Sequence, residues 1–167
     1  MKTLKYIHLD EQKMGTIVES LQKLLANFQI YYTNIRGFHW NITGHQFFRL
    51  HEKFEELYLD ASEKADDIAE RILALSGSPK NSFNDYLQVS KIEDISGVSC
   101  AEEAVKILLE NISLLISLEK EILEQSNDAA DDSTASMMSD YIREQEKLVW
   151  MLVAYFSDTC TVSGATK

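Results

Sequence analysis

The side chains with metal-binding chemistry gather in one stretch of this chain. Three of its four histidines, His39, His45 and His51, lie close together, and a helical pattern that carries Asp66 and Glu70 follows them. Imidazole combined with carboxylate suits first-row transition metals, whereas calcium and magnesium prefer sites made of oxygen alone. Iron is the first candidate.

A helix over residues 47–75 must position most of these groups, because apolar residues recur there at helical intervals. At about 100° per residue, four polar residues fall along one edge of the apolar stripe, at about 0°, 40°, 60° and 100°. They are His51, Glu55, Asp66 and Glu70. Polar residues on such an edge suit an interface between subunits.

The length of this helix separates the two halves of the candidate site. His51 precedes Asp66 by 15 residues, which puts them about 22 Å apart along the helix axis. One ion cannot touch both. If two copies pack this edge antiparallel about a two-fold axis, the histidine end of one meets the carboxylate end of the other, and two equivalent mixed sites form.

The neighbouring segments predict a helical hairpin. Asp10 can cap a first helix whose apolar spacing continues to about His39. A turn around Gly44 then leads into the second helix, which we expect to end at Gly77, just before Pro79.

The second half of the chain predicts two more long helices. Residues 80–98 form a connection too long for a tight turn, with one short amphipathic segment around Phe83. Ser99 and Glu102 match a capping box for a third helix, and Asp131 can cap a fourth. The expected fold class is therefore all-α: a ferritin-like four-helix bundle with a short extra helix in the crossover between helices 2 and 3.

Composition supports one domain over residues 1–167, with flexible tails at 1–9 and 161–167. The chain is 45% hydrophobic and has one proline, which favours long helices over a turn-rich β fold. Cys100 and Cys160 are isolated thiols, and the first residues lack the apolar run of a signal peptide. We therefore expect a cytoplasmic protein without a membrane helix.

A net charge of -11 argues against a general nucleic-acid binder, because phosphate affinity depends on Lys and Arg. It suits a shell that gathers cations, and it equally serves solubility.

Known metal and phosphate motifs are missing from the sequence. An intrachain di-iron site in a four-helix bundle needs Glu-x-x-His on two helices, but other residues stand three positions before the histidines. They are Lys5, Arg36, Ile42 and Phe48. HExxH, a glycine-rich phosphate loop and Gly-x-Ser-x-Gly are also absent.

The segment HWNITGHQFFRLH, followed by a helix ending in DDIAERILALSGSP, resembles the Dps family, ferritin-like miniferritins named as DNA-binding proteins from starved cells. The resemblance extends over nearly the whole chain, including the LVWM segment near Trp150. It implies a hollow shell of twelve identical subunits, a homododecamer. It also implies that this shell is a ferroxidase that oxidises Fe(II), preferentially with hydrogen peroxide, and stores the ferric product inside.

The same resemblance assigns the ligands. It implies that His39 and His51 from one subunit bind iron together with Asp66 and Glu70 from its two-fold partner. Glu55 stands where the family has an acidic residue near the site, so we expect it to hold a second, weaker iron directly or through water.

We expect roles other than those of the four assigned ligands for two ring side chains near the site, Trp40 and His45. Trp40 is expected to pack partly in the core and, beside a site that handles peroxide, to be an electron donor. His45 lies outside the family's ligand set, and a surface or hydrogen-bonding role is the alternative for it.

The start of the fourth helix is a candidate pore. By resemblance, carboxylates here line the three-fold axes of the shell and draw iron inward; the alternative is N-capping with a favourable helix dipole interaction. The candidates are Asp128, Asp131 and Asp132, and Ser136 stands where many relatives carry a further acid.

Two other functions compete with iron oxidation. One is a structural DNA-compacting protein of the same fold, which a basic N-terminal extension would favour; here the first nine residues contain two lysines. The other is a helical scaffold whose metal site has lapsed, which retention of all four ligand positions opposes.

Overall fold

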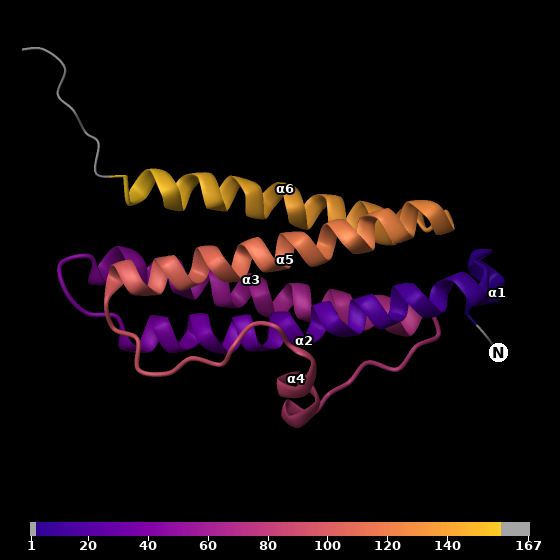
Figure 1. Ribbon diagram of the computed structural model, residues 1–167, viewed down its shortest axis with the longest axis horizontal. Coiled ribbons are helices and arrows are strands. Elements are labelled where there is room, and N and C mark those ends of the chain that lie inside the picture. The colour runs from indigo at the N-terminus through magenta and orange to yellow at the C-terminus, as the bar shows by residue number, and fades with distance from the viewer. Residues whose placement is uncertain (1–2, 158–167) are drawn as a thin grey trace, which may run out of the picture.

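The computed structural model describes residues 3–157, and its long helices lie side by side in one bundle (Figure 1). These helices are α2 (Glu11–Asn41), α3 (Phe47–Ala74), α5 (Ala101–Ala129) and α6 (Asp132–Tyr155). The short α1 (Leu4–Ile7) precedes them, and α4 (Phe83–Val89) lies in the crossover between α3 and α5. The prediction of an all-α four-helix bundle with a short crossover helix is confirmed.

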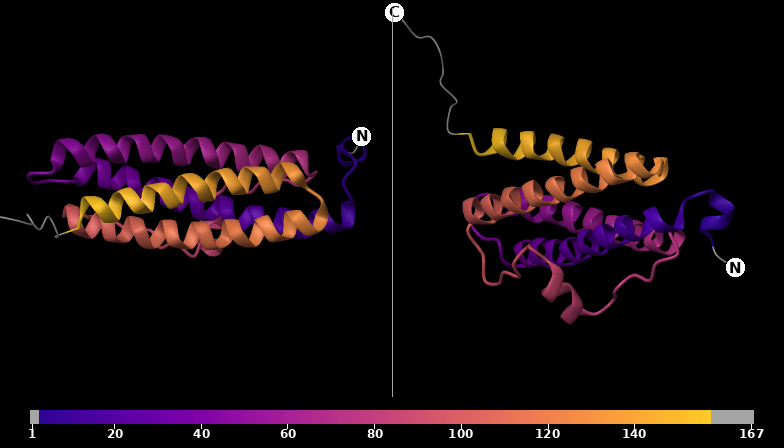
Figure 2. Two further views of the ribbon diagram at one scale, coloured as in Figure 1. Left: turned by 90° about the horizontal axis from the view of Figure 1, so that it is seen from above. Right: turned by 45° about the vertical axis from the view of Figure 1, so that its right-hand side comes forward.

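The four long helices run along a common bundle axis (Figure 2), and each of them buries apolar side chains in the core. Helix α2 packs against α3, α5 and the short α4, and α5 packs against α6. Phe28, Phe38 and Phe54 are among the largest fully buried side chains. The apolar stripe predicted for α3 is buried, as Leu50, Leu57 and Ile68 illustrate.

Side-chain amides of α2 hold the crossover along the bundle. The Asn27 Oδ1 accepts hydrogen bonds from the backbone amides of Lys91 (2.9 Å) and Ile92 (3.0 Å). Further along α2, Asn34 Nδ2 donates to the carbonyl of Glu93 at 2.8 Å. These bonds give backbone groups of the crossover hydrogen-bond partners on α2.

Of the helix caps predicted at Asp10 and Ser99, the structure confirms the first and contradicts the second. Asp10 caps α2 through the Gln12 amide at 2.8 Å, as expected. The predicted capping box at Ser99 is wrong, because Cys100 is the N-cap of α5 and makes no side-chain cap bond. The Ser99 carbonyl instead accepts the Thr43 amide at 3.1 Å, which ties this segment to the turn between α2 and α3.

Residues 3–9 of the N-terminal lead include the short helix α1. Leu4 is 4% exposed and belongs to the apolar core, which anchors α1. The tail expected over residues 161–167, and Cys160, lie outside the described residues. Within residues 3–157, no helix is long and apolar enough to cross a membrane.

Two charged side chains that the sequence did not single out are buried in the bundle. Lys64 forms salt bridges with Asp60 and, at 2.9 Å, with Glu144. Glu119 accepts a hydrogen bond from Gln145 Nε2 at 2.6 Å. Burial raises the pKa of Glu119 to about 8, although the Gln145 hydrogen bond and Lys64 oppose the shift.

This raised pKa makes stability depend on pH. The pKa of Glu119 is higher in the folded chain than its ordinary value of 4.5, so the folded state keeps a proton that the unfolded state releases. The contribution of Glu119 to the free energy of unfolding is therefore complete below about pH 4.5 and is lost as pH rises to about 8.

We expect Glu119→Gln to remove this loss while keeping an acceptor for Gln145. Relative to wild type, the variant should gain free energy of unfolding as pH rises from 5 to 8, by at most about 1.4 kcal/mol per pH unit. Urea unfolding at fixed protein concentration measures this gain. Glu124→Gln, at an exposed position of the same helix, is the control, and equal pH profiles for both variants would contradict the assignment.

Candidate metal centre

His39 and His51 are bonded to each other's backbone. His39 lies in the last turn of α2 and His51 near the start of α3. The His39 Nδ1 lies 2.8 Å from the His51 carbonyl, and the His51 Nδ1 lies 2.8 Å from the His39 carbonyl. Their rings stack with centroids 3.8 Å apart and an interplanar angle of 18°. The structure therefore brings together the two predicted imidazole ligands.

These bonds determine which ring nitrogen can bind a metal. A carbonyl oxygen only accepts hydrogen bonds, so each Nδ1 must carry a proton and donate it. In the neutral ring the lone pair is then on Nε2, which is free to coordinate a metal. Both side chains are thus oriented and held in the ligand tautomer by the backbone itself.

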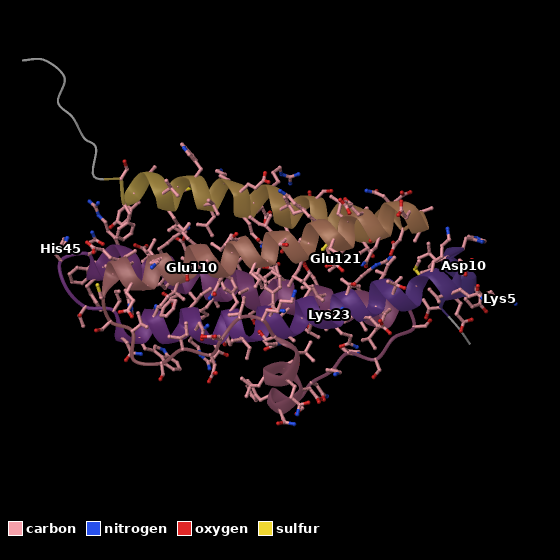
Figure 3. The ribbon with its side chains drawn as sticks, viewed as in Figure 1. Lys5, Asp10, Lys23, His45, Glu110 and Glu121 are labelled. Atoms are coloured by element: carbon pink, nitrogen blue, oxygen red, sulfur yellow. The ribbon has the colours of Figure 1, made fainter. Side chains whose placement is uncertain are left out.

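The turn over residues 42–46 makes this arrangement possible. Gly44 has a φ of +95°, a left-handed conformation that favours glycine, and its carbonyl accepts the Phe47 amide at 3.1 Å as α3 begins. The Phe47 ring then stacks on His51 with centroids 5.0 Å apart. His45 is exposed at this turn (Figure 3) and lines a separate groove with Cys100.

Asp66 and Glu70 are exposed on the second half of α3. A straight helix places Asp66 about 22 Å from His51. Among residues 3–157 of one chain, no three histidine, cysteine or acidic side chains lie together in an arrangement that could hold a metal ion. The structure brings the two histidines together but does not bring the carboxylate pair to them within a single chain.

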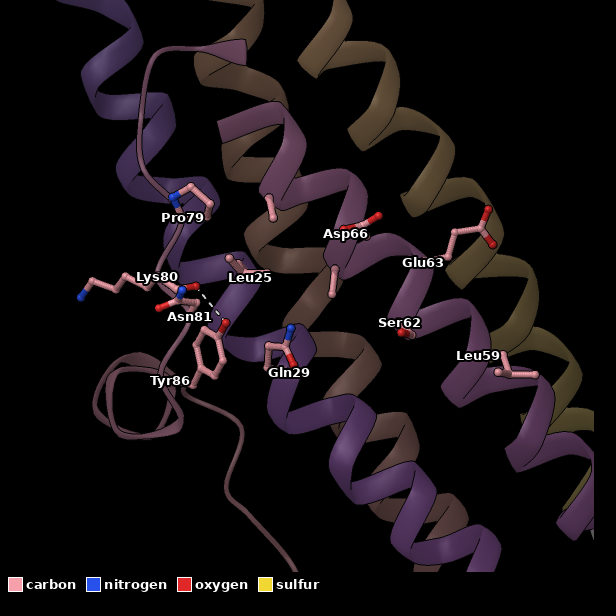
Figure 4. A pocket seen from close by; sticks show the side chains of 12 residues that line it. Leu25, Gln29, Leu59, Ser62, Glu63, Asp66, Pro79, Lys80, Asn81 and Tyr86 are labelled. Carbon is pink, nitrogen blue, oxygen red and sulfur yellow. Dashed lines mark hydrogen bonds between the residues drawn. The ribbon is translucent and has the colours of Figure 1, made fainter. Parts of the chain in front are cut away.

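A groove of about 580 Å³ runs beside Asp66, between α2, α3 and the crossover (Figure 4). Lys80 and Tyr86 line its crossover side, where the Tyr86 hydroxyl donates to the Lys80 carbonyl at 2.8 Å. Asp66 is thus one of the residues that line this open groove.

Glu55 is exposed one turn after His51 and accepts a hydrogen bond from the Tyr58 hydroxyl at 3.4 Å. The Tyr58 ring meets the His39 ring edge-on, with centroids 5.4 Å apart. Desolvation and the Glu55 carboxylate raise the pKa of Tyr58, which keeps the phenol protonated. The sequence gives no signal for this contact, because it arises from packing between α2 and α3.

Trp40 is 65% exposed although it follows His39 directly. The guanidinium of Arg36 lies 5.0 Å from the Trp40 ring centre and 4.8 Å from the Tyr32 ring centre. Arg36 Nη1 also donates to the Tyr32 hydroxyl at 2.9 Å. A cation therefore contacts both of these aromatic rings.

The candidate pore carboxylates differ in exposure. Asp128 and Asp132 are exposed, whereas the Asp131 side chain is 1% exposed. Asp131 pairs with Arg71 and accepts from the amide and hydroxyl of Thr134. Asp131 therefore caps α6 and joins it to α3, and the pore prediction depends on Asp128 and Asp132.

Comparisons of the sequence with a family model and with a known protein agree on one family. A family model described as a ferritin-like domain matches residues 18–161. A DNA protection during starvation protein of Porphyromonas gingivalis is 42% identical over 154 residues, which cover 92% of this chain and 97% of that protein.

Solved structures extend the comparison to three dimensions. The Dps protein of Vibrio cholerae O1, described as a member of a broad superfamily of ferritin-like diiron-carboxylate proteins, is 44% identical with a TM-score of 0.88, and covers 89% of this chain and 94% of that one. Dps of Bacillus brevis is 34% identical with a TM-score of 0.84, and covers 87% of this chain and 98% of that one. The chain belongs to the ferritin-like proteins and, among them, to the Dps family.

Proposed function

We propose that this protein is a ferroxidase and iron store that removes hydrogen peroxide. The observation that carries the proposal is the pair of reciprocal hydrogen bonds that hold His39 and His51 with Nε2 available. Two stacked imidazoles fixed in the ligand tautomer suit a transition metal, and iron is the metal that the diiron-carboxylate description of the Vibrio cholerae relative favours.

The complete site forms between two chains. His39 and His51 of one subunit bind Fe(II) together with the partner subunit's Asp66 and Glu70, and Glu55 holds a second, weaker iron. The support is geometric: all these groups lie on one exposed edge of α3 or beside it, and the length of α3 prevents them from meeting within one chain. Twelve such subunits assemble as six two-fold pairs into a hollow shell in the cytoplasm.

The reaction uses each group according to its charge. The neutral imidazoles bind Fe(II) without adding charge to the site. The carboxylates compensate the two positive charges of Fe(II) and favour the ferric product. Hydrogen peroxide accepts two electrons from two ferrous ions and leaves as water, so no hydroxyl radical forms. Ferric ion then moves to the acidic inner wall, and Asp128 and Asp132 at the pores supply further Fe(II).

An anaerobic Fe(II) titration followed by peroxide tests this function. We expect native mass spectrometry to show twelve chains, saturable Fe(II) binding, and oxidation of two ferrous ions for each peroxide consumed. Peroxide should oxidise iron faster than oxygen at equal concentration. A shell that binds no Fe(II) would instead be a scaffold with a lapsed site, and a stable monomer would contradict the assembly.

Mixed shells test whether the site is shared. In His39→Asn/His51→Asn, asparagine keeps a donor near the position of Nδ1 but removes the Nε2 ligand; the second variant is Asp66→Asn/Glu70→Gln. Each variant alone should lose the peroxide-dependent ferroxidase rate. Shells co-assembled from equal amounts of both should recover about one quarter of it, because half of the pairs are mixed and each mixed pair has one intact site.

The control for the mixed shells is Glu52→Gln/Glu56→Gln, which neutralises two exposed carboxylates on the same helix. These shells should keep the wild-type rate alone and in mixtures. If correctly assembled mixed shells of the two ligand variants stay as inactive as their parents, the site does not lie between subunits.

The Porphyromonas gingivalis relative is named for DNA protection. A shell that removes iron and peroxide would protect DNA without binding to it. With a net charge of -11, we expect no gel shift of duplex DNA at about 150 mM salt, because phosphate binding needs clustered cations. Micromolar or tighter binding in the presence of a chelator would favour the DNA-compacting alternative, and binding lost on chelation would indicate bridging metal ions.

A further inference from the structure

Tyr58 lies between the metal-binding imidazole and a carboxylate. Its ring contacts the His39 ring edge-on at 5.4 Å, and its hydroxyl donates to Glu55 at 3.4 Å. Oxidation of a phenol releases an electron and a proton together, so a competent donor needs an acceptor for each. The geometry supplies both: His39 leads to the iron, and Glu55 accepts the proton.

We propose that Tyr58 supplies the second electron to peroxide when only one ferrous ion occupies the site. This inference rests on the proposed function, because iron and peroxide are its reactants. With one ferrous ion alone, peroxide would receive one electron and release hydroxyl radical. Tyr58 completes the two-electron reduction, so that water forms in the site.

The step balances in atoms, protons and electrons. Fe(II), the Tyr58 phenol, hydrogen peroxide and one proton give Fe(III), a neutral tyrosyl radical and two waters. The O–O bond of peroxide breaks, iron and Tyr58 each lose one electron, and the phenol proton passes by way of Glu55 to the oxygen that leaves as water. A later ferrous ion restores the phenol by giving one electron while one proton returns, and it becomes ferric.

Glu55 connects this step to iron occupancy. The same carboxylate is the candidate ligand for the second, weaker iron. This second position is empty when iron is scarce. Under that condition Glu55 is available to the Tyr58 hydroxyl. When a second ferrous ion binds, it provides the second electron itself, and Tyr58 is not needed.

The contacts of Arg36 oppose radical formation on the neighbouring rings. Its guanidinium lies 4.8 Å from the Tyr32 ring centre and 5.0 Å from that of Trp40. A cation over an aromatic face stabilises the neutral ring and disfavours the loss of an electron from it. Tyr32 touches Tyr58, with centroids 6.0 Å apart, so Arg36 keeps the radical on Tyr58. The role expected of Trp40 is thereby assigned to Tyr58.

Electron paramagnetic resonance after rapid freezing tests the assignment. Wild-type shells receive less than one ferrous ion per chain and then peroxide, and a tyrosyl signal should appear that narrows when the protein contains ring-deuterated tyrosine. Tyr58→Phe should lose most of this signal and release more hydroxyl radical to a spin trap. Trp40→Phe should keep the signal, and Arg36→Met should add a tryptophan component.

Tyr141→Phe is the matched control, because Tyr141 is a buried tyrosine whose hydroxyl also donates to a carboxylate of α3, that of Asp67, at 3.3 Å. It should keep the wild-type signal. A full signal in Tyr58→Phe, or its loss in Trp40→Phe, would overturn the inference while leaving the ferroxidase proposal intact. If wild-type shells oxidise iron with peroxide but form no radical, the inference also fails alone; if they oxidise no iron, both fail.

Discussion

The reciprocal hydrogen bonds between His39 and His51 are the constraint on which the candidate centre depends. The His39 carbonyl belongs to the last turn of α2, where backbone acceptors lack partners within the helix. The His51 ring satisfies it at 2.8 Å, so one bond completes a helix end and orients a ligand. Since each bond contributes only about 1 kcal/mol net, its main effect is geometric: the ends of α2 and α3 cannot shift without misplacing both rings.

Helix α3 then decides where a complete site can form. Because Phe47–Ala74 is one helix, the distance between the histidine end and the carboxylate end is fixed by the helical rise and cannot close by bending. In the proposed two-fold pair, the exposed edge that carries Glu55, Asp66 and Glu70 would lie against the antiparallel edge of a second copy. Catalysis by such a chain would depend on assembly, since a lone subunit offers half of each site.

The sequence predicted what periodicity encodes: the long helices, the apolar stripe of α3, and the Asp10 cap. It failed where contacts between distant segments decide the outcome. Ser99 matched a local capping pattern, but its carbonyl pairs with Thr43, and the helix starts one residue later. Likewise, the ring contact of Tyr58 with His39 and the burial of Glu119 arise from packing between helices, which local spacing does not specify. The candidate ligands could be named from the family resemblance, and their metal binding stays a prediction; the tautomer of His39 and His51 had no signal in the sequence.

The burial of Lys64 also bears on where metal can bind. Ferritin-like di-iron sites lie inside the bundle and use Glu-x-x-His on two helices, a motif that this sequence lacks. Here the interior contains the Lys64 ammonium, paired with Asp60 and Glu144, while Glu119 nearby keeps its proton up to about pH 8. The Lys64 ammonium already occupies the carboxylate oxygens of Asp60 and Glu144, and a protonated Glu119 carboxyl is a poor metal ligand. The interior is thus a poor site for a metal ion, which supports the proposal that iron binds at the edge of α3, between two subunits.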